Sequence, residues 1–205
     1  MLEFLTGAGL ALAAGLNAYI PLLIVGLASR FTGLIELPEA WQWLANDWVL
    51  VILGVLLVVE LVADKIPVVD HVNDVLQTVV RPVAGGLAFG SGSTAETVAV
   101  TDPAAFFESQ QWVPIAIGVV LALTVHAGKA ATRATVTATT AGLATPLVST
   151  VEDVGSAGLA FAAILLPVLI VGAFAALILG IIWLVRRRRR RVRASRETVA
   201  ERSGP

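Results

Sequence analysis

The sequence of 205 residues contains no cysteine, only two histidines and few charged residues. Without cysteine the protein has no disulfide framework, thiol nucleophile, iron–sulfur cluster or covalently attached c-type haem. His71 and His126 are too few for a histidine-rich metal site, so we expect no metal and no other cofactor. The sequence also lacks a nucleophile–base constellation, a nucleotide-binding loop and metal-ligand spacing. It therefore predicts a protein that is not an enzyme.

The scarcity of charge indicates a membrane protein. Charged residues make up 14% of the chain and hydrophobic residues 57%, with a mean hydropathy of +0.87, whereas a soluble domain carries about a quarter charged residues. The chain starts Met1-Leu2-Glu3 and lacks the basic segment that opens a secretory signal. We therefore expect the first apolar segment to remain as a membrane helix.

The net charge of −1 conceals two oppositely charged parts. Residues 1–185 hold 13 of the 15 acidic residues but five of the 14 basic ones, so their net charge is −8 and that of residues 186–205 is +7. This division predicts a transmembrane domain over 1–185 and a basic, disordered cytoplasmic tail over 186–205. The run Arg186–Arg191 favours contact with anionic lipid headgroups rather than nucleic acid.

Basic residues near span ends favour the cytoplasmic side of a membrane. The acidic connections 30–47 and 91–111 are then outside, as is Glu152 if the chain crosses six times. Both termini are expected in the cytoplasm.

Four apolar segments are long enough, or nearly so, to cross a bilayer as helices, and they are residues 5–28, 48–63, 112–127 and 159–185. Residues 66–90 and 130–154 are more polar, and each is expected to form a broken or re-entrant helix. The sequence thus predicts an all-α transmembrane bundle with about six crossings. Four crossings with two re-entrant segments is the alternative.

An offset of 64 residues aligns several uncommon residues, which indicates an internal repeat. The aligned pairs are Trp48 with Trp112, Lys65 with Lys129, and Pro82 with Pro146. Duplicated units with discontinuous helices are typical of transporters. The alternative is a chance alignment of segments rich in valine, leucine and alanine.

Four carboxylates fall within 15 residues, at Glu60, Asp64, Asp70 and Asp74. Members of each successive pair are one helical turn apart. Ionisable side chains in a spanning region usually face a cavity or a partner, so this cluster predicts a cation or proton site. The alternative is a cytoplasmic loop whose acids pair with basic residues, namely Lys65, Arg81, Lys129 and Arg133.

A second cluster contains His126, Lys129 and Arg133. It either neutralises the acids or forms an anion or phosphate-headgroup pocket, because arginine binds phosphate in a fork geometry. The first span carries a predicted helix break at Asn17, Tyr19 and Pro21, which binds an ion or is a packing kink.

Small residues recur every four positions at Gly7, Ala11 and Gly15. Such stripes allow helices to approach closely. They are expected to pack within the chain, and the alternative is a homodimer interface.

Four strings resemble one family of integral membrane proteins, catalogued as domain of unknown function 4126. They are Gly15-Leu-Asn-Ala-Tyr-Ile-Pro21, Glu60-x-x-x-Asp64-Lys65-x-Pro67-x-x-Asp70, Arg81-Pro82-x-x-Gly85 and Gly128-Lys129-Ala130-x-x-Arg133. The resemblance covers about residues 1–185 and implies a polytopic bacterial membrane protein. It implies no reaction and no substrate. We expect the protein in the inner membrane of the cell.

These observations favour a small transporter or permease-like protein whose carboxylates bind a cation or proton. A non-catalytic membrane scaffold or assembly partner is the first alternative, and a protein that handles lipid headgroups is the second. The transported solute or ion is not identified by the sequence.

Overall fold

The computed structural model describes residues 1–93, 107 and 110–202, and every regular element in these residues is a helix. The predicted all-α fold is confirmed. In chain order the elements are α1 (Leu2–Leu16), α2 (Tyr19–Leu27), the π-helix η1 (Ala28–Thr32), the 3-10 helix η2 (Glu39–Ala45), α3 (Asp47–Ala63), α4 (Pro67–Gly92), α6 (Trp112–Thr140), α7 (Thr145–Leu165) and α8 (Leu169–Arg202). The chain forms two compact units, Met1–Ile170 and Val171–Pro205.

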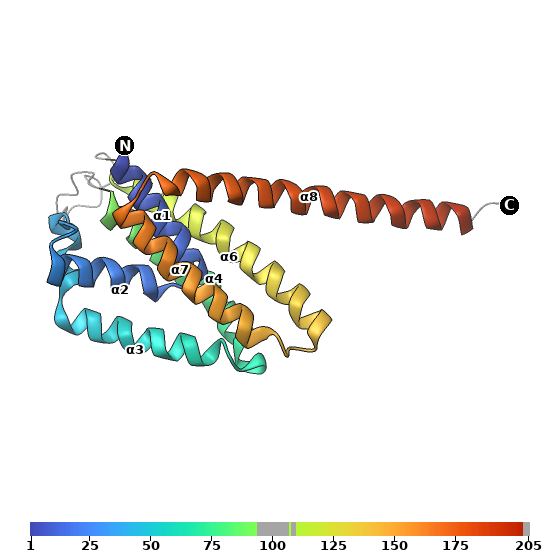
Figure 1. The fold of residues 1–205 in the computed structure, drawn as a ribbon, viewed down its shortest axis with the longest axis horizontal. Helices are drawn as coiled ribbons and strands as arrows, with labels where there is room; N and C mark the ends of the chain where they lie inside the picture. The colour runs from blue at the N-terminus through green and yellow to red at the C-terminus, as the bar shows by residue number, and fades with distance from the viewer. Residues whose placement is uncertain (94–106, 108–109, 203–205) are drawn as a thin grey trace. The chain divides into compact units, whose positions relative to one another are not determined.

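The first unit is organised around α1. This helix is apolar on all sides, and its residues from Gly7 to Gly15 are all buried, as expected for a helix inside a bundle. It packs against α4, α6 and α7 (Figure 1). Its small residues face neighbours within the chain, since Gly7 abuts Phe89 of α4 and Gly15 abuts Ala122 of α6.

The predicted first span is divided into α1 and α2. Asn17 has an extended backbone (φ −142°, ψ 125°), so α1 ends at Leu16. The Asn17 side-chain oxygen then accepts hydrogen bonds from the backbone N–H groups of Tyr19 (3.1 Å) and Ile20 (3.2 Å). Asparagine commonly caps a helix in this way, and α2 begins immediately afterwards.

A proline separates α3 from α4. Ile66 is extended (φ −105°, ψ 108°) and Pro67 opens α4, because the residue before proline avoids the helical region and proline fits the first turn of a helix. Within α4 the structure differs from the sequence prediction. The helix continues through Pro82 and the Gly85-Gly86 pair to Gly92.

Two further predicted segments have different boundaries in the structure. Residues 130–154 are not one broken segment, because α6 extends to Thr140 and α7 begins at Thr145. The chain turns between them at Ala141 (φ 50°) and Gly142 (φ 82°). The predicted span 159–185 is wrong as a single helix. Leu166 leaves the helical region (φ −141°, ψ 64°) ahead of Pro167, and α8 begins at Leu169.

Among the residues that the structure describes, three helices are long and apolar enough to cross a membrane, namely α6, α7 and the Leu169–Arg187 part of α8. The bent pair η2 and α3 makes a fourth if it counts as one span. Six crossings are therefore not confirmed. The internal repeat is not confirmed either. The first copy of the predicted repeat turns at Asp64–Ile66, whereas the aligned residues 128–130 of the second copy lie inside α6. The sequence aligns no proline with Pro67.

The second unit consists of most of α8. This helix contains the basic run Arg186–Arg191 and ends at Arg202. Arginine is a strong helix former, and the run directly continues an apolar helix. The division of the chain into a transmembrane domain and a disordered cytoplasmic tail stays a prediction. The acidic residues expected in the 91–111 connection fall at Glu96, Asp102 and Glu108, outside the described residues.

The contact between α4 and α6 provides a test of the packing. A Cβ atom at Gly85 would lie 2.7 Å from the Gly118 carbonyl oxygen and closer still to the Ala122 methyl group, whereas one at Gly54 of α3 has no neighbour within 4 Å. We expect Gly85→Ala to destabilise the fold by about 1–3 kcal/mol through overpacking. Gly54→Ala should be neutral or stabilising by up to about 1 kcal/mol, because alanine favours helix. Thermal unfolding in detergent measures both, and equal effects of the two variants would contradict the close packing.

Candidate functional site

A fully buried ion pair joins α3 to α4. Glu60 Oε1 accepts a hydrogen bond of 2.8 Å from Arg81 Nη2, and the side chains are 1% and 0% exposed. Truncating one member of such a pair leaves an uncompensated buried charge, which costs about 3–5 kcal/mol. This pair therefore fixes where α3 lies against α4.

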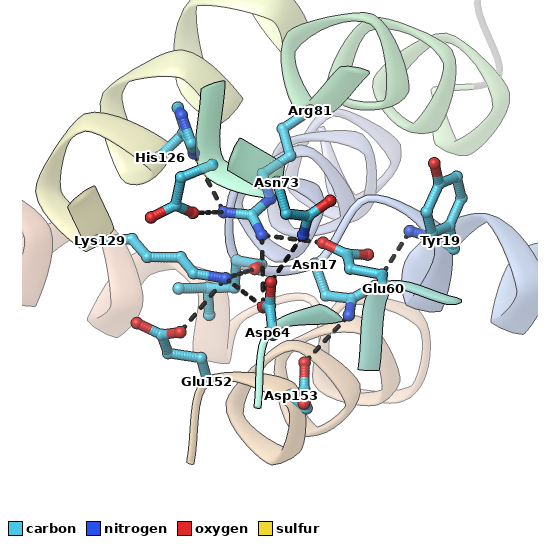
Figure 2. Close-up of polar contacts among 12 residues, drawn as sticks. Asn17, Tyr19, Glu60, Asp64, Asn73, Arg81, His126, Lys129, Glu152 and Asp153 are labelled. Carbon is cyan, nitrogen blue, oxygen red and sulfur yellow. Dashed lines mark hydrogen bonds and ion pairs between the residues drawn. The ribbon is translucent and has the colours of Figure 1, made fainter. Parts of the chain in front are cut away.

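Asp64, the residue after α3, contacts side chains from two other helices (Figure 2). Its Oδ2 atom lies 2.9 Å from Arg133 Nη2, 3.4 Å from Lys129 Nζ and 3.8 Å from Arg81 Nη2. Its Oδ1 atom accepts a 2.7 Å hydrogen bond from Asn73 Nδ2. One carboxylate thus connects the α3–α4 turn with α4 and α6.

Glu152 connects α6 with α7. Its Oε2 atom accepts hydrogen bonds from Arg133 Nε (2.9 Å) and Nη2 (2.7 Å), and Lys129 Nζ is 3.2 Å away. The sequence prediction placed Glu152 in an outer segment on the basis of six crossings. The structure places it beside two buried cations, because the 141–144 turn directs α7 back along the bundle, and its side of the membrane stays a prediction.

Side chains from α6 and α7 bind the polar groups at the α1–α2 break. Lys129 Nζ donates to the Leu16 carbonyl (2.9 Å), and Ser156 Oγ donates to that of Ala13 (2.9 Å). Asn17 Nδ2 donates to Asp153 Oδ1 (3.0 Å), whose Oδ2 is 3.7 Å from the half-exposed Lys65. The Leu16 carbonyl is the last of α1 and needs such a partner when it is buried, whereas the Ala13 carbonyl also accepts a hydrogen bond from the Asn17 backbone N–H (3.1 Å).

His126 of α6 extends the network from Arg81 to Thr78, both of which belong to α4. Arg81 Nη1 is 3.0 Å from His126 Nδ1, and His126 Nε2 is 3.2 Å from Thr78 Oγ1. A guanidinium can only donate, so Nδ1 accepts and the proton is on Nε2. The Thr78 hydroxyl in turn donates to the backbone carbonyl of Asp74 (3.0 Å). The geometry thus assigns a neutral imidazole to His126.

The described part of this network carries more negative than positive charge. Four carboxylates belong to it (Glu60, Asp64, Asp74 and Glu152), and their cationic partners are three (Arg81, Lys129 and Arg133). Adding the pair of Lys65 with Asp153 leaves the difference at one. Glu60 Oε2 and Gln77 Oε1 are buried without a hydrogen-bond partner among the described residues. Such atoms are uncommon in buried sites.

The structure brings together most of the residues that the sequence selects. Glu60, Asp64, Asp74, Arg81, His126, Lys129 and Arg133 are within one network. Lys65 lies at its edge, and Asn17 and Tyr19 are at the helix break with Pro21 in the first turn of α2. Asp70 belongs to α4, and its side chain lies outside the described part of the structure.

Sequence reasoning did not select Asn73, Thr78, Glu152 and Asp153 as site residues. For Asn73 and Thr78 a signal was available, since both fall on the polar side of α4 with Asp74 and Arg81. The described residues contain no group of three or more histidine or acidic side chains arranged to hold a metal ion.

Taken together, the described residues define an all-α protein with several helices apolar enough to be compatible with a membrane protein. The chain belongs to the family described as domain of unknown function 4126, whose model matches residues 4–187. Comparisons with curated proteins and with solved structures gave no match. The predicted family is therefore confirmed, and the family itself specifies no activity.

The hydrogen bonds of His126 predict its tautomer. In a His71→Asn variant, His126 is the remaining histidine, so its imidazole nitrogens give unambiguous ¹⁵N signals. At neutral pH we expect the neutral ring with the proton on Nε2, because Arg81 donates to Nδ1. An imidazolium, or a proton on Nδ1, would show that the contact with Arg81 is wrong.

Proposed function

We propose that this protein is a multi-pass membrane protein of permease type whose buried charge network takes up a proton or another cation. The observation that carries the proposal is the surplus carboxylate among the described side chains of the network. An uncompensated negative charge is expensive in a bilayer. A bound proton or cation would neutralise it.

Glu60 is the carboxylate best suited to accept that positive charge. Its Oε1 atom is already paired with Arg81, but its Oε2 atom has no hydrogen-bond partner although the side chain is buried. Protonation would convert an acceptor without a donor into a hydroxyl group. Since closely placed carboxylates can share protons, Asp64 at the end of the same helix is the second candidate.

The break between α1 and α2 supports the permease type. Transporter sites are commonly built where a helix is discontinuous, because the freed backbone groups can bind charged ligands. Here the break lies beside Lys129 and Asp153. An internal repeat and about six crossings form part of the same proposal.

For the orientation, we propose that both termini are cytoplasmic and that Arg186–Arg191 contact anionic lipid headgroups. The Arg187 guanidinium lies 5.0 Å from the centroid of the Trp183 ring. Tryptophan followed by arginine is the arrangement expected where a helix leaves a bilayer.

A second candidate is a membrane scaffold without transport. It is favoured by the burial of the network, since Glu60, Asp64, Arg81, Lys129 and Arg133 are each at most 4% exposed. Ion pairs of this kind can serve only to specify the helix arrangement. Binding of a phosphate headgroup is less favoured, because the three N–H groups of Lys129 already have three oxygen neighbours.

Flux measurements separate these functions. Purified protein is reconstituted into liposomes that contain pH-sensitive or cation-sensitive dyes, and the wild type is compared with Glu60→Gln and Asp64→Asn. We expect the wild type to conduct protons or a monovalent cation, Glu60→Gln to lose at least tenfold in rate, and Asp64→Asn to be impaired.

Asp47→Asn is the matched control, because Asp47 is an exposed acid at the start of the same helix. It should retain the wild-type rate. Leak-level flux of protons and of common cations in the folded wild type would contradict the permease proposal and favour the scaffold.

A further inference from the structure

Three oxygen atoms surround the Lys129 ammonium group. They are the Leu16 carbonyl oxygen at 2.9 Å, Glu152 Oε2 at 3.2 Å and Asp64 Oδ2 at 3.4 Å. These oxygens come from α1, α7 and the end of α3, so the ammonium joins three separate segments (Figure 2). We refer to them below as the oxygen cage.

The oxygen cage is negative independently of Lys129. Leu16 is the last residue of α1, and the carbonyl at the C-terminus of a helix carries part of the helix dipole. Arg133 holds both carboxylates in place through Nη2, at 2.9 Å from Asp64 Oδ2 and 2.7 Å from Glu152 Oε2. Backbone and carboxylate oxygens at a helix break are a suitable environment for a small cation.

A pocket leads to the oxygen cage. It has a volume of about 420 Å³, and its wall includes Leu16, Lys129 and Glu152 together with the apolar side chains of Leu147, Val148 and Val151. The same pocket therefore offers a charged end at the cage and an apolar wall from α7. This combination fits a small alkylammonium ion, with its charge at the oxygens and its tail along the valines.

We propose that the oxygen cage is a binding site for a monovalent cation of ammonium type, which the Lys129 side chain occupies in this conformation. A free ammonium ion enters through the pocket when the lysine does not fill the cage. That this cation is the one carried across the membrane rests on the proposed function. Its binding rests on the cage and the pocket.

Chemical rescue of Lys129→Ala tests the site, because the variant removes the ammonium group and its stem but keeps the three oxygens. Membranes that contain the variant are solubilised in the presence of butylammonium chloride, of butanol or of neither additive. The yield of monodisperse protein and its melting temperature are then measured. We expect butylammonium to recover most of the loss and butanol, which has the same length without the charge, to recover little. The comparison holds even if the variant folds poorly alone.

Two control variants sharpen the result. Lys65 is the other lysine of the chain and is half-exposed, so Lys65→Ala should not respond to butylammonium. Lys129→Met fills the space of the stem without a charge and should not respond either. Failure of butylammonium to rescue Lys129→Ala, equal rescue by butanol, or an equal response of Lys65→Ala would each overturn the proposal.

The rescue experiment measures binding of the cation and does not measure its transport. Rescue of Lys129→Ala together with leak-level flux in the wild type would support the cation site and contradict the proposed function. Flux without rescue contradicts the cation site alone.

Discussion

Asp64 accepts hydrogen bonds from Arg133 and Asn73 and lies within ion-pair distance of Lys129, and the arrangement of the first unit depends on this convergence. A buried carboxylate must be paired, since the penalty of leaving it alone amounts to several kcal/mol. Its partners come from α4 and α6, and through Glu152 the same cations also reach α7. If any one of these helices moved away, a buried charge would lose its partner in an apolar environment.

This requirement also explains how the first helix can be broken inside the bundle. A break leaves carbonyl and N–H groups without partners, which is tolerated in an apolar setting only where protein or water satisfies them. Asn17 caps α2, Lys129 binds the Leu16 carbonyl and Ser156 binds the Ala13 carbonyl. The charge network and the helix break are therefore one structural feature. Any movement of α7 that separated Glu152 from Lys129 would alter the polar contacts of the break as well.

The sequence predicts the all-helical fold and the family, because hydropathy and a specific string are local signals. Two features depend on more than local signals. Hydropathy alone favours one helix over 159–185, although the extended backbone of Leu166 before Pro167 divides it. Glu152 resembles an outer acid until the left-handed turn at Ala141 brings α7 against α6. Which acid pairs with which base likewise depends on the packing of glycines such as Gly85 and Gly118, which sets how closely α4 approaches α6.

The most direct test of this account is a double-mutant cycle on the buried ion pair of Glu60 and Arg81. Arg81→Met should lower the free energy of unfolding by about 3–5 kcal/mol, because it leaves Glu60 buried and unpaired. The double variant with Glu60→Gln should recover part of that loss, giving a coupling energy of about 1–3 kcal/mol. The same cycle on the exposed pair of Arg30 and Asp47 should give at most about 1 kcal/mol. Additive effects at Arg81 and Glu60, or a coupling no larger than that of the exposed pair, would contradict a structure held in place by its buried charges.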